Sequence, residues 1–92
     1  MNDLVDTFEF VEMYICGTTA SGKTAVFAVR NRHHGDELGT IIWYGPWHQY
    51  VFRADTGTLY SNGCLRDIAT FVAEQTEIQR RGRLRSWPKA RP

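Results

Sequence analysis

The sequence has few cysteines, few prolines and no long apolar run. Its 92 residues include two cysteines and three prolines. Cys16 and Cys64 lack C-x-x-C spacing, and two cysteines do not make a secreted disulfide framework, so we expect both to be thiols in a reducing cytoplasm. The apolar runs are far shorter than the roughly 20 residues that span a bilayer, and residues 1–6 carry two aspartates and no basic residue. Neither export nor membrane insertion is expected.

Acidic residues are missing from the end of the chain. Six of the eleven basic residues follow Gln79, whereas the preceding part holds the other five and all ten acidic residues, which gives it a net charge of −5. The length suits one domain with one modest core. We therefore predict a single domain over residues 1–79 and a basic, flexible tail over residues 80–92, which has two prolines near its end and no hydrophobic period.

Apolar and β-branched segments separated by short polar loops predict an antiparallel β-meander. The predicted strands cover residues 8–16, 24–30, 39–44 and 47–53, with a short fifth strand at 58–60. A helix over roughly 63–80 follows N-cap candidates at 61–63, because Leu65, Ile68, Ala69 and Val72 recur at the spacing of one helical stripe. The predicted fold class is α+β: a four- to five-stranded antiparallel sheet with one C-terminal amphipathic helix packed on one face.

The most informative segment is residues 43–52, which hold five of the twelve aromatic residues around Gly45-Pro46. Bulky rings on both sides of a Gly-Pro break predict an aromatic β-hairpin, because such side chains pack across a pleated ladder. Alternation along the strands would bury about half of the rings beneath the helix. The others would form an exposed patch suited either to stacking single-stranded bases or to a protein partner.

Residues 17–24 match G-x-x-x-x-G-K-[ST], the phosphate-binding loop of nucleotide hydrolases. That chemistry needs a helix beginning at Lys23-Thr24, so that the helix N-terminus meets phosphate, but the following residues are typical of a strand. The sequence favours a hairpin loop over a nucleotide site.

No catalytic or metal-binding constellation is evident. Cys64 near a helix N-terminus could act as a nucleophile with His48 as its base, but a cysteine on an apolar stripe is more often a core residue. The cysteines together with His33, His34 and His48 lack the clustered spacing of zinc sites. We expect no enzyme activity, no metal and no cofactor, and keep a Cys64 enzyme or a nucleotide site at Lys23 only as residual alternatives.

Several segments together resemble a recurrent group of short, uncharacterised phage and bacterial proteins. They are a W-Y-x-x-W-x-Q-Y-x-F hairpin (residues 43–52), a C-L-x-D-I-x-x-F helix (residues 64–71), Gly22-Lys23-Thr24 before a strand, and Leu38-Gly39-Thr40. Where that group usually has arginine this chain has His48, and Ala54 stands where a proline usually follows. The resemblance implies a phage or prokaryotic origin, a bacterial host cytoplasm and a meander-plus-helix fold, and no established activity.

Two functional hypotheses follow. In the first, a small non-enzymatic, phage-encoded protein binds a host protein or ribonucleoprotein complex that targets nucleic acid, as an anti-CRISPR-like inhibitor of host defence would, because its acidic body can imitate phosphate. In the second, the protein binds DNA or RNA through the hairpin aromatics and the Arg-rich tail. No membrane partner is expected. The candidate binding residues are Trp43, Tyr44, Trp47, His48, Tyr50, Arg53, Arg80, Arg81, Arg83 and Arg85.

Overall fold

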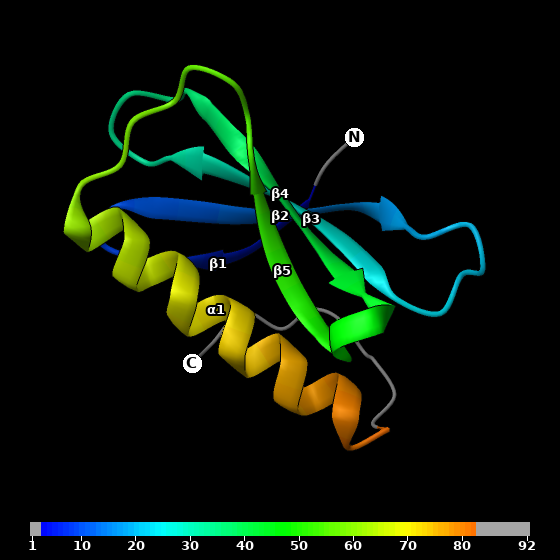
Figure 1. The fold of residues 1–92 in the computed structure, drawn as a ribbon. Helices are drawn as coiled ribbons and strands as arrows, with labels where there is room; N and C mark the ends of the chain where they lie inside the picture. Colours follow the sequence, from blue (N-terminus) through cyan, green and yellow to red (C-terminus); the bar gives the residue numbers. More distant parts are fainter. Residues whose placement is uncertain (1–2, 83–92) are drawn as a thin grey trace.

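A computed structural model describes residues 3–82 and contains one antiparallel sheet and one long helix (Figure 1). The five strands follow one another across the sheet in sequence order, β1-β2-β3-β4-β5. Their bounds are Asp3–Thr7 (β1), Val11–Thr18 (β2), Ala25–Asn31 (β3), Glu37–Tyr44 (β4) and Gln49–Ala54 (β5), and the helix α1 covers Asn62–Arg80. The predicted α+β class, the antiparallel meander and the C-terminal helix are confirmed.

The first part of the sheet differs from the prediction. The strand expected over residues 8–16 begins only at Val11, as β2, and an additional strand, β1, precedes it. Residues 8–10 form the turn between the two strands, in which Phe8 N donates to Val11 O at 2.8 Å. β1 is short and contains two aspartates, the usual composition of a sheet edge, so its apolar signal is reduced to Leu4 and Val5.

The fifth strand predicted at residues 58–60 is wrong, because that segment forms no ladder. Side chains hold it in place instead. Thr58 Oγ1 donates to Asp55 O at 2.8 Å, and Tyr60 Oη donates to Leu38 O at 2.8 Å. The segment therefore serves as a packed connection between β5 and α1.

The loop prediction for the phosphate-loop-like motif is confirmed. β2 ends at Thr18 and β3 begins at Ala25, directly after the Gly22-Lys23-Thr24 triplet. Thr19 N donates to Thr24 O at 2.9 Å, which closes the loop between two antiparallel strands. No helix follows the lysine, so the arrangement of a nucleotide hydrolase is not present here.

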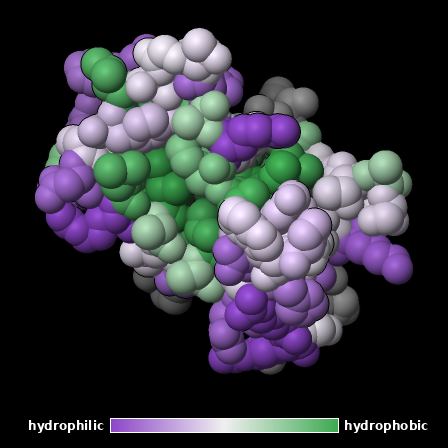
Figure 2. All heavy atoms as spheres, viewed as in Figure 1, coloured by the Kyte–Doolittle hydropathy of each residue, from purple (hydrophilic) through white to green (hydrophobic). Residues whose placement is uncertain are grey.

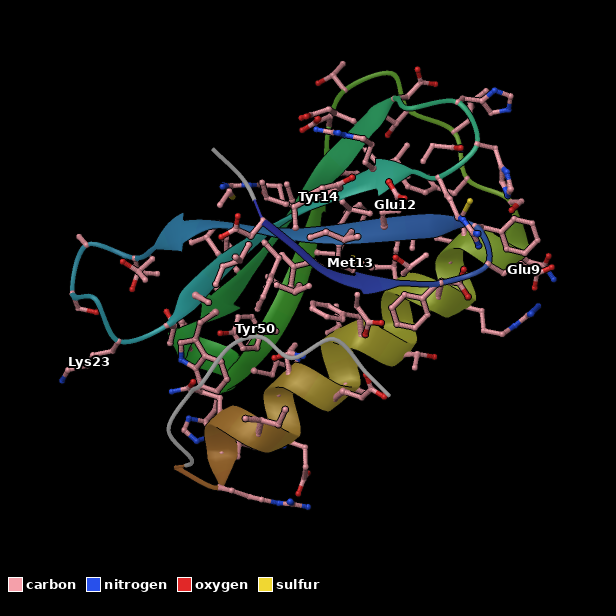
Figure 3. All side chains as sticks on the ribbon, turned by 180° about the vertical axis from the view of Figure 1, so that it is seen from behind. Glu9, Glu12, Met13, Tyr14, Lys23 and Tyr50 are labelled. Atoms are coloured by element: carbon pink, nitrogen blue, oxygen red, sulfur yellow. The ribbon has the colours of Figure 1, made fainter. Side chains whose placement is uncertain are left out.

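The core lies between α1 and one face of the sheet, because alternate residues of each strand point to that face. Seven side chains are completely enclosed: Tyr50, Phe27, Phe71, Met13, Ile41, Val11 and Val29. Cys64 is also buried in this core, as its place on the apolar stripe predicts. Figure 3, seen from behind, shows Met13 and Tyr50 directed into the layer between sheet and helix.

Polar contacts fix the helix on the sheet. The Ser61 Oγ caps the helix by accepting a hydrogen bond from Cys64 N at 3.1 Å, in agreement with the predicted N-cap region. Near the other end of α1, Thr76 Oγ1 accepts from Tyr50 N at 2.9 Å, which satisfies a buried amide on the edge strand β5. The bond between Tyr50 and Thr76 ties the C-terminal half of α1 to β5. Over residues 3–82, α1 does not have the sustained apolar length that a membrane span requires.

Candidate functional site: the hairpin end

The turn between β4 and β5 is a short hydrogen-bonded helix. Gly45–Trp47 form a short 3₁₀ helix with Pro46 in its first turn, where a missing amide hydrogen costs nothing. His48 ends this helix in the left-handed region (φ 55°, ψ 46°), and His48 N donates to Gly45 O at 2.9 Å. A non-glycine residue in this region is uncommon and is kept there by its surroundings. The backbone therefore presents the His48 ring in one direction.

The hairpin aromatics divide into two pairs on opposite faces of the sheet. Trp43 and Tyr44 are neighbours in β4, so their side chains point in opposite directions. On the helix side, Trp43 packs edge-on with His48 at 5.2 Å between ring centroids. On the open side, Tyr44 packs edge-on with Trp47 at 5.0 Å. Trp47 is 63% exposed, which leaves one face of its indole available to a ligand.

The last turn of α1 joins this group of rings. Arg80 Nε donates to His48 O at 2.8 Å, although 32 residues separate them in the sequence. Figure 1 shows the last turns of α1 beside the start of β5, and Figure 2 shows hydrophilic residues gathered there below a central apolar band. We call the group Trp43, Tyr44, Trp47, His48 and Arg80 the hairpin end. It combines aromatic rings with an exposed cation.

Other sequence-predicted residues lie elsewhere. Tyr50 is only 2% exposed, and its hydroxyl donates to Ala25 O at 3.3 Å. It was wrong as a binding residue, because β-alternation turns it into the core. Arg53 is exposed and lies opposite Thr40 in the β4–β5 ladder. This position is about 16 Å along the strand direction from His48, so Arg53 is not part of the hairpin end. Arg81 forms an exposed ion pair with Glu77 at 3.1 Å.

The other predicted binding residues of the tail, Arg83 and Arg85, lie outside the described residues 3–82, as does most of the predicted tail. Its contribution to binding therefore stays a prediction.

The centre of the open sheet face is a polar network rather than an aromatic platform. Tyr14 Oη donates to Glu12 Oε1 at 2.9 Å, the Arg30 guanidinium lies 4.6 Å from the Tyr14 ring centroid, and Arg30 forms an ion pair with Glu37 at 3.3 Å. The hydrogen bond to Glu12, followed by burial, raises the pKa of the Tyr14 phenol above its ordinary value of 10.0. Bases have no row of rings to stack on there, so the hairpin end is the better candidate site.

This network predicts a pH effect. Because the pKa of Tyr14 is raised in the folded protein, the unfolded chain loses its phenol proton first as the pH rises. The contribution of Tyr14 to stability is therefore complete below pH 10.0 and declines as the pH passes the folded pKa. In an ultraviolet titration of tyrosinate, we expect Glu12→Gln to move one ionisation step to lower pH. That step must be the one that Tyr14→Phe removes; if the steps of wild type and Glu12→Gln coincide, the network is not formed.

Sequence reasoning missed that the β2–β3 loop also reaches this end. Loop residues around Lys23 share a hollow with Trp43, His48 and Gln79 of α1. The G-K-T motif did draw attention to this loop. Sequence analysis considered only whether its backbone amides could bind phosphate, whereas in the structure side chains of the loop lie opposite the hairpin.

The alternative catalytic pair is separated by the length of the helix. Cys64 lies in the first turn of α1, whereas His48 contacts Arg80 in the last, about 24 Å further along the helix axis. His48 therefore cannot act as a base for Cys64. Both cysteines are free thiols, and burial, followed by the nearby Glu37, raises the pKa of Cys16. Within residues 3–82, no three His, Cys, Asp or Glu side chains are grouped to hold a metal ion.

Comparison with known proteins points to a phage source. The chain is 31% identical over 55 residues to the "Uncharacterized 9.3 kDa protein" of Acholeplasma phage L2, and the match covers 60% of this chain and 70% of the phage protein. This chain belongs to the family of that phage protein. No family model matches the chain, and no solved structure does. The family relationship agrees with the phage origin that the sequence resemblance implies, while the finer motif resemblance stays a prediction.

Proposed function

We propose that this protein of a phage family is a small, non-enzymatic binding protein whose hairpin end binds single-stranded nucleic acid. The observation that carries the proposal is the contact between Arg80 and His48, because it brings a helix cation to the tip of the aromatic hairpin. Proteins that bind single strands without strong sequence preference combine such cations with rings on which bases stack.

The exposed ring pair supplies the stacking surface. The Trp47 indole is 63% exposed and the Tyr44 ring 40% exposed, and each is held edge-on by the other. Their fixed geometry lowers the entropy cost of ordering them around a base. Arg80 can contact a phosphate with the guanidinium nitrogens that do not bond His48, because a guanidinium carries five N–H donors.

The rest of the molecule restricts where a nucleic acid can lie. All ten acidic residues fall within the described part, which has seven basic residues and therefore a net charge of −3. Phosphates avoid such a body and are attracted only where cations gather. We therefore expect a short footprint of a few nucleotides at the hairpin end, extended by the basic residues that follow Arg81.

A second candidate function is the binding of a host complex that targets nucleic acid, in the cytoplasm of an infected bacterium. The same exposed Trp47 supports it, since tryptophan and arginine are enriched among residues that dominate protein interfaces. The acidic body supports it as well, because it can occupy a basic nucleic-acid channel. In this case the partner, and not free nucleic acid, contacts the hairpin end.

The two functions are separated by titrating labelled single-stranded DNA, single-stranded RNA and duplex DNA with the purified protein at two salt concentrations. The proposed function predicts that single strands bind more tightly than duplex and that binding weakens as salt rises, because phosphate contacts release counterions. A chain ending at Gly82 should bind more weakly with a smaller salt slope. Absence of binding at low salt contradicts nucleic-acid binding, and affinity capture of host complexes then tests the second candidate.

A further inference from the structure

A hollow of about 430 Å³ opens between the β2–β3 loop, the hairpin and the end of α1. Its lining residues come from three separate elements: Thr19, Ser21, Lys23 and Thr24 from the loop, Trp43 and His48 from the hairpin, and Gln79 from the helix. Sites for small ligands commonly measure about 300 to 1,000 Å³, so this hollow suits one small ligand rather than a polymer.

The loop side of the hollow is rich in hydroxyl groups. Thr19 Oγ1 lies 3.2 Å from Ser21 Oγ and 3.1 Å from Thr24 Oγ1, and Ser21 Oγ also accepts from Lys23 N at 3.3 Å. These bonds, with the backbone bond between Gly22 N and Thr19 O at 2.8 Å, hold the loop in one shape. An exposed lysine thus stands beside a fixed set of hydroxyls, a combination that suits a phosphate group.

The opposite side is aromatic and can hold a planar ring. Trp43 is half-buried against Tyr50, with 5.3 Å between centroids, and His48 is fixed by its left-handed backbone and by Arg80. Gln79 adds an amide that both donates and accepts hydrogen bonds. Because the last turn of a helix carries partial negative charge, a ligand anion is better placed on the Lys23 side than beside Gln79.

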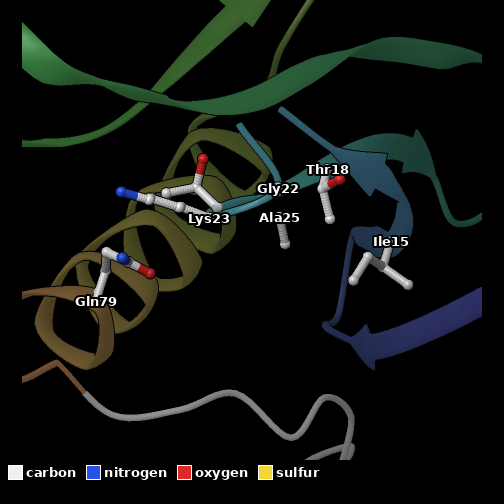
Figure 4. A pocket seen from close by; sticks show the side chains of 7 residues that line it. Ile15, Thr18, Gly22, Lys23, Ala25 and Gln79 are labelled. Carbon is white, nitrogen blue, oxygen red and sulfur yellow. The ribbon is translucent and has the colours of Figure 1, made fainter. Parts of the chain in front are cut away.

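A second, smaller hollow of about 200 Å³ adjoins the same lysine. Lys23, Thr24 and Gln79 line both hollows, and Figure 4 shows the smaller one, with Lys23 on the loop and Gln79 on α1. Lys23 therefore borders both recesses.

We propose that the larger hollow is a subsite for one nucleotide, with its phosphate at Lys23 and the loop hydroxyls and its base at Trp43 and Gln79. This inference rests on the proposed function, since the subsite would receive one nucleotide of the strand whose neighbours lie on the hairpin end. It differs from a nucleotide-hydrolase loop, because side chains and not helix amides bind the phosphate, and no bond is broken.

Adenosine 5′-monophosphate, adenosine and inorganic phosphate are suitable probes in ligand-observed NMR titrations of the full chain. We expect the monophosphate to bind at least about tenfold more tightly than adenosine, because a charge-assisted hydrogen bond strengthens binding by about that factor. Lys23→Ala should weaken the monophosphate by about tenfold, whereas Lys23→Arg should retain most of the affinity. Arg66→Ala removes one exposed positive charge near the start of α1 and should leave the affinity unchanged.

The proposal is overturned if the monophosphate does not bind, or if Lys23→Ala and Arg66→Ala behave alike. Oligonucleotide binding is measured in parallel with the same preparations. If single strands bind at the hairpin end but the monophosphate does not bind, the subsite is wrong and the proposed function stands. If neither binds, the proposed function fails with it.

Discussion

Replacing Trp47 by alanine is expected to weaken the binding of single-stranded DNA roughly 10- to 100-fold, because one stacked base contributes about 1 to 3 kcal/mol. The indole is 63% exposed, so its removal takes away a contact surface without opening the core. The measurement is a fluorescence-anisotropy titration of a labelled oligothymidylate at low salt, with circular dichroism to show that the variant is folded.

Leu59→Ala is the matched control for this substitution. Leu59 is 88% exposed, and its neighbour Tyr60 bonds Leu38 near the start of β4, at the opposite end of the strand from Trp47. The control removes exposed apolar area from a surface that the proposal leaves unused, so it should bind like the wild type. Equal affinities of Trp47→Ala and wild type would mean that the hairpin end does not stack bases.

The largest effect on stability is expected from Gly39→Ala. Gly39 lies in β4 opposite Ala54 of β5, and a Cβ atom there would overlap the Arg53 carbonyl oxygen and lie 2.9 Å from Phe52 Cε1. Its φ of +158° adds strain for any side chain. Because backbone and not a flexible side chain blocks the site, β4 and the edge strand β5 must separate. We expect a loss of about 3 kcal/mol in the free energy of unfolding, measured by urea denaturation.

Gly45→Ala provides the comparison in the same hairpin. A Cβ atom at Gly45 meets nothing within 4 Å. We expect this variant to unfold within about 0.5 kcal/mol of the wild type, as surface substitutions usually do. If the two alanine variants have the same midpoint, the close approach of β5 to Gly39 is not a feature of the folded protein.

Much of the fold could be predicted from local patterns. Helical spacing predicted a helix over roughly 63–80, and α1 covers Asn62–Arg80. The predicted stripe was wrong in part, because Leu65 is 52% exposed and the buried face of α1 includes Cys64, Ile68 and Phe71 instead. The aromatic hairpin was predicted from Gly45-Pro46 between ring-rich segments. β1 was missed because a short, charged edge strand has little apolar pattern, and residues 58–60 were misassigned because a Tyr60 side-chain bond replaces the ladder there.

Only part of the candidate site could be predicted from the sequence. The sequence singled out Trp43, Trp47 and His48, because clustered rings are conspicuous in any fold. Local patterns do not say which ring alternation turns inward, so Tyr50 was included with the exposed residues. The hydrogen bond of Arg80 to His48, and the hollow that Lys23 and Gln79 both line, depend on how α1 crosses the sheet, and that angle comes from packing of the whole core.

The most direct test of the hairpin end is to map the binding surface by NMR, adding a short oligothymidylate to isotope-labelled protein. Binding at this site predicts the largest amide and indole shifts at Tyr44, Trp47, His48 and Arg80, with little change in the polar network around Tyr14. Shifts centred on Tyr14 and Arg30, or at the opposite end around Leu59, would contradict the account, because the oligonucleotide would then bind a surface without the paired rings and the helix cation.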